Sequence, residues 1–381
     1  MATVKLGDIA IEAKSSNKGD KTGIRIVGLE HLTPSNVTLS SWSEDTENTF
    51  TKEFSKGDVL FGRRRAYLKK AAVAPFDGIC SGDITVIRAI EDKVDPDLLP
   101  FIIQNDFLFD FAVGKSAGSL SPRVKWTHLK EFAIELPLMP EQSKLAETLW
   151  SINETKNAYE DLINKTDELV KSQFIEMFGD IENNQKGYPI KQIDEFSDLF
   201  AGATPSTKVS AYWKNGTIPW MSSGEVHMGR VTSTEKKISQ FGYDKCSTKM
   251  VPLHTVVIAL AGQGKTRGTV AVTEIELCTN QSLCAMVTDE TVLSDYLYHN
   301  LRNRYEEIRN MCAIADGRGG LNLKIVGSIK VIVPSIEEQQ QFVAFAEQSD
   351  KSKFALQEAI KDLDALTKKI IAENLIPAGK E

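Results

Sequence analysis

The strongest constraint on the fold is an internal repeat that relates the two halves of the 381-residue chain. Residues 128–137 read HLKEFAIELP and are followed by LMPEQ; 197 positions later, residues 325–334 read IVGSIKVIVP and are followed by SIEEQ. In both segments apolar residues alternate as in a β-strand, a proline ends the strand, and Glu-Gln opens a helix. Upstream, Asp58 aligns with Thr255 and Cys80 with Cys278 at nearly the same offset. The repeat therefore duplicates a whole module of about half the chain.

Each copy ends in a pattern typical of a long amphipathic helix. The first pattern begins near Pro140 and stops at Gly179, and the second opens with the capping box Ser335-x-x-Glu338 and ends before Pro377. Each helix could pack on its own domain, but about 40 residues span ~60 Å, more than the width of a small domain. We therefore expect the two helices to pack on each other as a spacer. The apolar positions expected to form this spacer are Leu145, Leu149, Ile152, Tyr159, Leu162, Leu169, Leu356, Ile360, Leu363 and Ile370.

The segments outside these helices contain short β-type runs, glycine turns and shorter helical runs, which predicts an α+β fold with a twisted, partly closed sheet in each copy. The predicted organisation is a globular part at 1–137, a helix at 138–180, a globular part at 181–334 and a helix at 335–381.

The net charge of −7 is distributed unevenly over these four parts. Residues 1–137 carry −1 and residues 181–334 carry +2, whereas the helical segments 138–180 and 335–381 carry −5 and −3. Basic residues cluster in the globular parts, at residues 63–70 and, at the matching place of the second copy, at residues 265–267. Such clusters suit contacts with phosphates, although any single one could be a solvated turn. The acidic helices suit contacts with other proteins better than contacts with DNA.

Composition excludes several other classes of protein. Hydrophobic residues make up 41% of the chain and charged residues 25%, which is ordinary for a globular protein. No apolar run is long enough to cross a bilayer and the N-terminal segment lacks a secretory signal, so a cytoplasmic protein without a membrane partner is expected. The five cysteines and five histidines are scattered without ligand spacing, so no metal site is expected.

No catalytic signature is complete. The run from Ala261 to Thr266 resembles a phosphate-binding loop, but Ala259 stands where the pattern requires its first glycine, and a turn between two strands is expected there. A base-flipping Asn-Pro-Pro-Tyr run, a nuclease centre and a catalytic triad are likewise missing from the sequence. We therefore expect a chain that is not itself an enzyme.

Together these features resemble the DNA-specificity subunit of type I restriction-modification systems. The resemblance is carried by residues 136–142 (LPLMPEQ) with residues 174–180 (FIEMFGD), by residues 333–339 (VPSIEEQ), and by residues 202–206 (GATPS) with residues 216–220 (GTIPW). The first module lacks the Thr-Pro-Ser and Pro-Trp signature, so its membership rests on the repeat and on residues 58–61.

The resemblance implies two target-recognition domains that read an asymmetric, bipartite site on double-stranded DNA. Antiparallel helices related by a pseudo-twofold axis would fix the gap between half-sites and dock two methyltransferase subunits, with motor-endonuclease subunits as further partners. S-adenosylmethionine, ATP and Mg2+ would be bound by those partners and no cofactor by this chain. The residues ranked as DNA contacts are Arg63, Arg64, Arg65, Lys69, Lys70, Ser206, Lys208, Lys265, Arg267 and Arg318.

Two alternatives from other classes remain open at this point. One is an enzyme that binds a nucleoside triphosphate through Gly264, Lys265 and Thr266; the other is a coiled-coil scaffold without DNA contact. The target bases, the length of the gap and the choice between restriction and methylation alone do not follow from the sequence.

Overall fold

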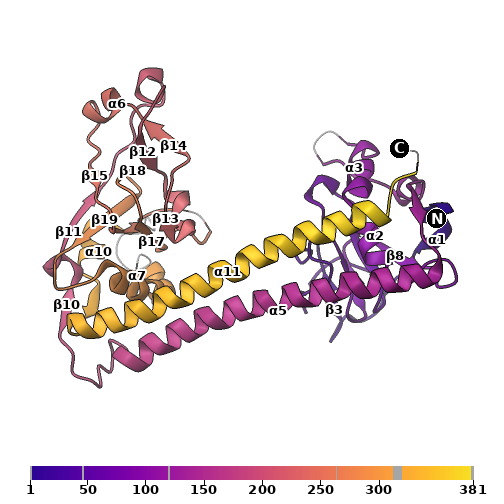
Figure 1. The fold of residues 1–381 in the computed structure, drawn as a ribbon, viewed down its shortest axis with the longest axis horizontal. Helices are drawn as coiled ribbons and strands as arrows, with labels where there is room; N and C mark the ends of the chain where they lie inside the picture. The colour runs from indigo at the N-terminus through magenta and orange to yellow at the C-terminus, as the bar shows by residue number, and fades with distance from the viewer. Residues whose placement is uncertain (1, 45–46, 119–120, 263, 312–319, 379–381) are drawn as a thin grey trace. The chain divides into compact units, whose positions relative to one another are not determined.

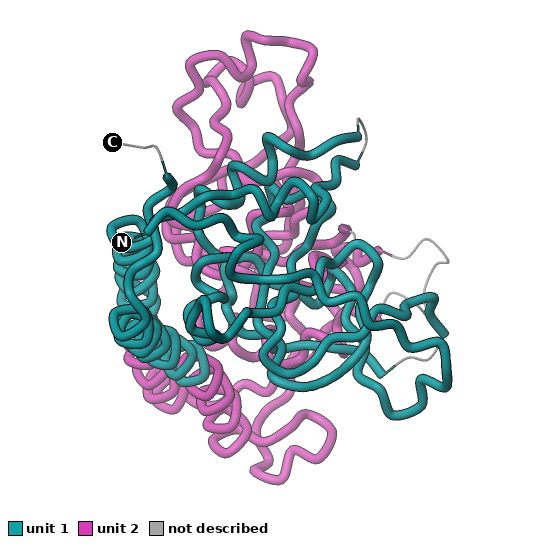
Figure 2. Tube along the Cα trace, turned by 90° about the vertical axis from the view of Figure 1, so that its right-hand side faces the viewer, with its two compact units in different colours: residues 1–162, 355–381 teal, residues 163–354 magenta. Residues whose placement is uncertain are grey.

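The computed structural model describes residues 2–44, 47–118, 121–262, 264–311 and 320–378 (Figure 1). The chain forms two compact units (Figure 2): unit 1 comprises residues 1–162 and 355–381, and unit 2 comprises residues 163–354. Each unit contains one globular part and a portion of both long helices, α5 (Met139–Phe178) and α11 (Ile336–Asn374). None of the described helices is both long and apolar enough to cross a membrane.

The globular part of unit 1 is mixed α and β, as predicted. One sheet has the order β2-β8-β5-β6, a second β3-β7-β4, and a strand pair β1-β9 closes the part against α5. The strands are β1 (Ala2–Lys5), β2 (Ala10–Glu12), β3 (Arg25–Val27), β4 (Lys52–Phe54), β5 (Val59–Gly62), β6 (Ala71–Val73), β7 (Gly78–Cys80), β8 (Ile84–Ala89) and β9 (Ala133–Leu136). The helices are α1 (Leu6–Ile9), η1 (Ala66–Leu68), α2 (Leu99–Ile103), α3 (Asp106–Gly114) and α4 (Trp126–Leu129).

Unit 2 repeats this plan with a larger sheet, β11-β19-β16-β17-β13, a smaller one, β14-β12-β18-β15, and the strand pair β10-β20. Its strands are β10 (Ile190–Gln192), β11 (Ser197–Ala201), β12 (Ile218–Met221), β13 (Arg230–Val231), β14 (Lys236–Ile238), β15 (Met250–Val251), β16 (Val256–Ala259), β17 (Val270–Thr273), β18 (Leu277–Thr279), β19 (Leu283–Thr288) and β20 (Lys330–Ile332). Its helices are η2 (Ile193–Glu195), η3 (Ser210–Tyr212), η4 (Ser223–Met228), α6 (Gln240–Asp244), α7 (Ser294–Asn303), α8 (Tyr305–Asn310) and α10 (Leu323–Gly327).

Register shows that the two globular parts are copies of one fold. In unit 1 Val59 of β5 faces Val73 of β6, and in unit 2 Val256 of β16 faces Val272 of β17. Likewise β3 runs parallel to β7 and β12 runs parallel to β18, with Cys80 and Cys278 in matching positions. The repeat predicted from the sequence is therefore confirmed in the pairing of the strands.

The Glu-Gln pair of the repeated junction locks each helix to its globular part. The buried Gln142 side chain donates to the carbonyl of Pro137 at 2.9 Å and accepts from the amide of Asp95 at 3.0 Å. The buried Gln339 side chain donates to the carbonyl of Pro334 at 3.0 Å and accepts from the amide of Leu293 at 2.9 Å. Because both satisfy buried backbone groups, this motif serves the junction of strand and helix rather than a ligand.

Within each unit the two helices run antiparallel. In unit 1 the Lys156 ammonium lies 2.7 Å from the Asp364 carboxylate, and Leu149 packs in one core with Ile371. In unit 2 Lys353 lies 2.7 Å from Asp167. Both lysine side chains are only 12% exposed, so these ion pairs lie in the seam between the helices.

The capping box predicted at Ser335 is present, since its hydroxyl and amide bind the Glu338 carboxylate at 2.8 and 3.1 Å. Gly179 follows α5 with a positive φ of 76°, as expected of a helix stop.

Two of the apolar positions named in α5 lie outside its buried stripe. Leu162 is 48% exposed and Leu169 is 53% exposed, whereas Leu149 and Val170 are buried. The stripe follows the three- and four-residue spacing through Ile163 and Val170, so Leu162 and Leu169 lie one residue, about 100° of helix, away from it. The remaining predicted positions are buried or half-buried: Leu145, Leu149, Ile152, Tyr159, Leu356, Ile360, Leu363 and Ile370.

Candidate nucleic-acid interface

The two basic clusters predicted from the sequence occupy equivalent hairpins. Residues 63–70 connect β5 to β6, and residues 260–269 connect β16 to β17. The amide of Gly62 donates to the carbonyl of Lys70 at 2.8 Å, and the amide of Ala259 donates to the carbonyl of Thr269 at 3.0 Å. The same strand pair therefore carries a hairpin at the same place in both copies.

In the unit 1 hairpin, most of the predicted cations have partners within the protein. The Arg64 guanidinium binds the Ser121 hydroxyl at 2.5 Å and lies 3.5 Å from the Asp83 carboxylate. The Lys69 ammonium binds Asp106 at 2.5 Å, and the Lys70 ammonium donates to a backbone carbonyl, that of Leu29, at 2.7 Å. These three cations hold the hairpin in place and are poorly available to a phosphate.

Asp83 collects the positive charge beneath the hairpin. Hydrogen bonding from Arg123, at 2.7 Å, and the charges of Arg64 and Arg63 hold the pKa of this carboxyl below its ordinary value, against the opposing effect of partial burial. The Arg63 side chain is itself half-buried, and its Nε finds no partner among the described residues. Arg63 therefore points into the base of the hairpin.

The tip of this hairpin presents a different set of side chains. Arg65 is exposed, and Tyr67 and Leu68 are 54% and 41% exposed, on a single 3-10 turn whose Ala66 is buried. Arg65 and Lys69 flank the turn in the left-handed region, with φ of 55° and 50°. This conformation is unfavourable for residues with a Cβ. The anchored cations keep the turn in this shape, and Arg65 is the cation it offers to a ligand.

The unit 2 hairpin also exposes a basic side chain, but its turn is built with glycines. Gly262, Gly264 and Gly268 have positive φ, and the Lys265 side chain is exposed between them. The Tyr305 hydroxyl donates to the Lys265 carbonyl at 3.0 Å, and Thr266 lies 3.1 Å from His227. The turn joins two antiparallel strands, as expected, whereas a phosphate-binding loop joins a strand to a helix. Arg267 is half-buried in the same hairpin.

The segment after β11 is held by the residues that carry the family resemblance. The Trp220 indole donates to the Ala203 carbonyl at 3.0 Å, the Trp213 indole donates to the Ser206 carbonyl at 3.2 Å, and the two indoles meet edge to face at 5.1 Å. A Cβ at Gly202 would lie within 1.9 Å of the Thr279 carbonyl oxygen, so only glycine fits there. The motif therefore shapes the loop, and Ser206 and Lys208 are exposed on it.

A shallow pocket beside this loop contains two lysines that were not ranked as DNA contacts. It is lined by Thr207, Ser210, Trp213, Lys236 and Lys237, and the Lys236 ammonium lies 6.0 Å from the centre of the Trp213 ring. A cation beside an aromatic face suits a nucleic-acid backbone and its bases. The adjacent lysines at 236 and 237 were the sequence signal, but the pairing of β12 with β14 was needed to bring them to this loop.

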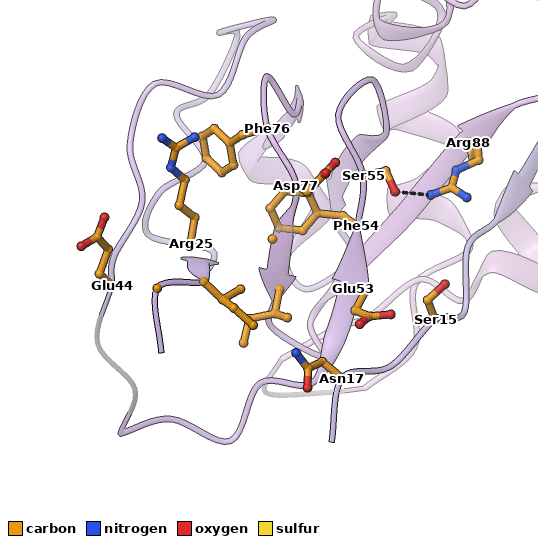
Figure 3. A pocket seen from close by; sticks show the side chains of 14 residues that line it. Ser15, Asn17, Arg25, Glu44, Glu53, Phe54, Ser55, Phe76, Asp77 and Arg88 are labelled. Atoms are coloured by element: carbon orange, nitrogen blue, oxygen red, sulfur yellow. Dashed lines mark hydrogen bonds between the residues drawn. The ribbon is translucent and has the colours of Figure 1, made fainter. Parts of the chain in front are cut away.

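A second pocket, in unit 1, contains side chains that no sequence motif indicated (Figure 3). Arg25 rises beside the Phe76 ring, and Glu44, Glu53 and Asp77 line the same pocket. No signal in the sequence singles out these residues, because they come from separate strands and loops.

Arg318 lies outside the described residues. Among the residues that the structure describes, no group of three or more His, Cys, Asp or Glu could hold a metal ion.

The family model for the type I restriction modification DNA specificity domain matches residues 1–167 and again residues 185–363. The chain belongs to this family. The two matched segments correspond to the two copies of the repeat.

Individual relatives match over one part of the chain. It is 28% identical over 163 residues to the specificity subunit of the Escherichia coli type I restriction enzymes EcoR124I and EcoR124II, an alignment that covers 42% of the chain and 40% of that relative. It is 27% identical over 169 residues to the specificity subunit of the type I restriction enzyme MjaIX of Methanocaldococcus jannaschii, covering 42% of the chain and 38% of that relative. The chain thus matches well under half the length of these relatives.

Two solved structures share the whole fold. One is a chain from the type I restriction-modification system, described in terms of complex assembly and conformational transition, with a TM-score of 0.59, 20% identity, and coverage of 98% of this chain and 97% of that one. The other is the type I restriction-modification S subunit of M. genitalium, with a TM-score of 0.58, 14% identity, and coverage of 98% and 96%. At these identities the likeness concerns the fold alone.

Proposed function

We propose that this chain is the specificity subunit of a type I restriction-modification complex and reads a bipartite, asymmetric target on double-stranded DNA. Residues 1–137 and 181–334 are its two target-recognition domains, and the segments 138–180 and 335–381 space them. The observation that carries the proposal is the repetition of one hairpin with an exposed cation, Arg65 in one copy and Lys265 in the other. Two copies of one surface suit two DNA segments, and the sequence differences between the two modules suit different bases.

In this proposal the long helices dock two methyltransferase subunits and, through the assembled complex, motor-endonuclease subunits. Their net negative charge and their exposed apolar side chains, among them Leu169, Ile175 and Leu366, support contacts with proteins rather than with phosphates. The chain itself is not an enzyme; S-adenosylmethionine, ATP and Mg2+ act on the partner subunits.

The decisive experiment maps modified bases in DNA from a methylation-free host that expresses the chain with its methyltransferase subunits. Exchange of residues 1–137 for the equivalent module of another family member should change one half of the methylated motif and leave the other half unchanged. Exchange of residues 181–334 should do the opposite.

A methylated motif that is unchanged after both exchanges would refute the assignment of one half-site to each module. The two alternative functions give other outcomes in the same host. A scaffold without DNA contact gives no motif that depends on either module, and a nucleotide-binding enzyme loses its ATP binding with Lys265→Ala, whereas exchange of residues 1–137 leaves that binding unchanged.

A further inference from the structure

The side chains of Arg25, Trp42 and Phe76 meet at the edge of the small sheet β3-β7-β4 in unit 1. Figure 3 shows Arg25 beside the Phe76 ring. The Arg25 guanidinium carbon lies 4.5 Å from the centre of the Phe76 ring and 4.9 Å from that of Trp42. The two rings meet edge to face at 5.0 Å, and Phe76 leans on Phe54, which is only 3% exposed. Arg25 is exposed, but its guanidinium therefore packs on a ring that itself contacts the buried Phe54.

The backbone fixes the same arrangement. Ile26 and Ser43 exchange two hydrogen bonds, of 2.8 and 2.9 Å, which join the strand of Arg25 to the segment of Trp42. A Cβ at Gly78 would lie 2.5 Å from the Arg25 carbonyl oxygen and 2.7 Å from Phe54, so only glycine permits this close approach. The position of the Arg25 guanidinium is thus set before any ligand binds.

The hydrogen-bond donors of Arg25 are uncommitted. Among the residues that the structure describes, its guanidinium has neither a hydrogen bond nor an ion pair. Arg88, in the same pocket, binds both carboxylate oxygens of Asp58 at 2.7 Å and the Ser55 hydroxyl at 3.0 Å (Figure 3). Arg88 therefore has a structural role, whereas Arg25 presents an exposed, planar set of donors.

The surroundings of Arg25 favour the edge of a base over a phosphate. The carboxylates of Glu44, Glu53 and Asp77 line the same pocket, and their negative charge opposes a phosphate. A base edge is neutral: an arginine fork binds N7 and O6 of guanine, and a carboxylate accepts from the amino group of cytosine. Resting on the proposed function, we propose that Arg25, held by Trp42 and Phe76, reads a guanine in the half-site bound by residues 1–137.

The second copy gives this proposal an internal contrast. Strand pairing aligns the two copies here. Val27 pairs with Cys80 and Trp220 pairs with Cys278, so Val27 corresponds to Trp220. One residue earlier, Ile26 pairs with Ser43 and Pro219 pairs with Lys237, so Ser43 corresponds to Lys237. By this register Ile218 takes the place of Arg25, and Lys236 takes the place of Trp42. The same position in unit 2 has no arginine fork, so the two half-sites are read by different chemistry.

The test uses the full chain assembled with its methyltransferase subunits, and begins by selecting bound sequences from a random duplex library. The unsubstituted chain should select a motif with an invariant guanine in one half-site. Arg25→Ala should abolish the preference at that one position, and Arg25→Lys, which keeps the charge but loses the fork, should relax it about 10-fold. Arg65→Ala is the matched control and should weaken all duplexes alike without changing the motif.

A second measurement separates base reading from a folding defect. Replacing the selected guanine by 7-deazaguanine, which lacks N7, should weaken binding of the unsubstituted chain about 10-fold and leave binding of Arg25→Ala unchanged. Uniform weakening by Arg25→Ala, with the motif retained, would show a phosphate contact and overturn the inference. An unaltered motif would overturn it as well. If the unsubstituted chain selects no motif, the proposed function itself fails, which is a separate result.

Discussion

The two units join a globular part to a helix in the same geometry but with different chemistry. Both use a buried glutamine at the junction and a lysine–aspartate pair in the seam. In unit 1 the space beside the helix is filled by Trp150, which meets Phe101 at 5.2 Å and donates to the Asp97 carbonyl at 2.8 Å. In unit 2 the corresponding space holds a network of charges. The same fold thus accommodates aromatic packing beside the helix in unit 1 and ion pairs beside it in unit 2.

The ionic network of unit 2 centres on Arg230 of β13. Its guanidinium lies 2.8 Å from Glu274, 2.6 Å from Asp295 of α7 and 3.7 Å from Asp350 of α11. Burial acts to lower the pKa of Arg230, but Asp295 and Glu274 outweigh it and raise the pKa. Lys353 continues the network, 2.8 Å from Asp350. The charges therefore link β13, α7 and α11 within unit 2.

The largest expected effect is that of Arg230→Met. It leaves three carboxylates without their common cation, and we expect the free energy of unfolding of unit 2 to fall by about 3 kcal/mol. Thr38 occupies the position of Arg230 in unit 1. Val73 and Val272 are equivalent residues of the two sheets, and Thr38 pairs in parallel with Val73 just as Arg230 pairs in parallel with Val272. Thr38→Val is therefore the matched control and should change little.

Hydrogen exchange followed by mass spectrometry reports the two units separately and is the measurement of choice for this pair of variants. Equal protection of unit 2 in Arg230→Met and in the unsubstituted chain would remove the proposed difference between the units.

The next effect concerns pH. His299 of α7 is buried against Phe342 at 5.2 Å, and burial lowers its pKa to about 4, with Asp350, Asp295, Arg302 and Arg230 as the facing charges. The unfolded chain protonates this histidine near pH 6.5 and the folded one near pH 4, so stability is lost as pH falls through that window. We expect a loss of about 2 kcal/mol in unit 2 between pH 7 and pH 5.

The control for this prediction comes from the other copy. The Gln142 side chain accepts from the Asp95 amide, and the Gln339 side chain accepts from the Leu293 amide, so residue 95 corresponds to residue 293. Phe101 and His299 each lie six residues further on and therefore correspond to each other. His299→Phe should flatten the pH dependence of hydrogen exchange in unit 2 and leave unit 1 unchanged. A slope that persists in this variant would assign the acid sensitivity to the carboxylates instead.

The smallest effect is expected in the seam. Among the described residues, Lys353 pairs with two carboxylates, those of Asp167 and Asp350, whereas Lys156 pairs with that of Asp364. Because the carboxylates are partly exposed, Lys353→Met should cost about 1 kcal/mol and Lys156→Met about 0.5 kcal/mol, measured by denaturant unfolding with local exchange as the readout. The opposite ranking would show that the unit 2 network adds nothing to its seam.

Local patterns predicted much of this fold. Alternation predicted the buried strands at 132–136 and 329–333, and the Ser335 capping box predicted the start of α11, because both signals depend on neighbouring residues. The equivalence of the two basic hairpins also followed from the repeat.

The roles of single cations did not follow from the sequence, because their partners are distant. Lys69 binds Asp106, 37 residues away, and Arg64 binds Ser121, 57 residues away. The stack of Arg25 on Trp42 and Phe76 is likewise assembled by strand pairing. The two basic hairpin clusters could be located from the sequence, but which of their members face solvent is a property of tertiary structure.

The strand β9 has a consequence for the order in which the protein is made. Its one edge pairs with β1, and its other edge binds the segment after α11, where the Glu135 amide donates to the Ile376 carbonyl at 2.8 Å and the Ala378 amide donates to the Ala133 carbonyl at 3.0 Å. Unit 2 is a continuous stretch, whereas unit 1 needs residues from both sides of it. During synthesis, residues 1–162 of unit 1 leave the ribosome first, but residues 355–381 of the same unit leave it after all of unit 2. Unit 2 can therefore fold before unit 1 is complete.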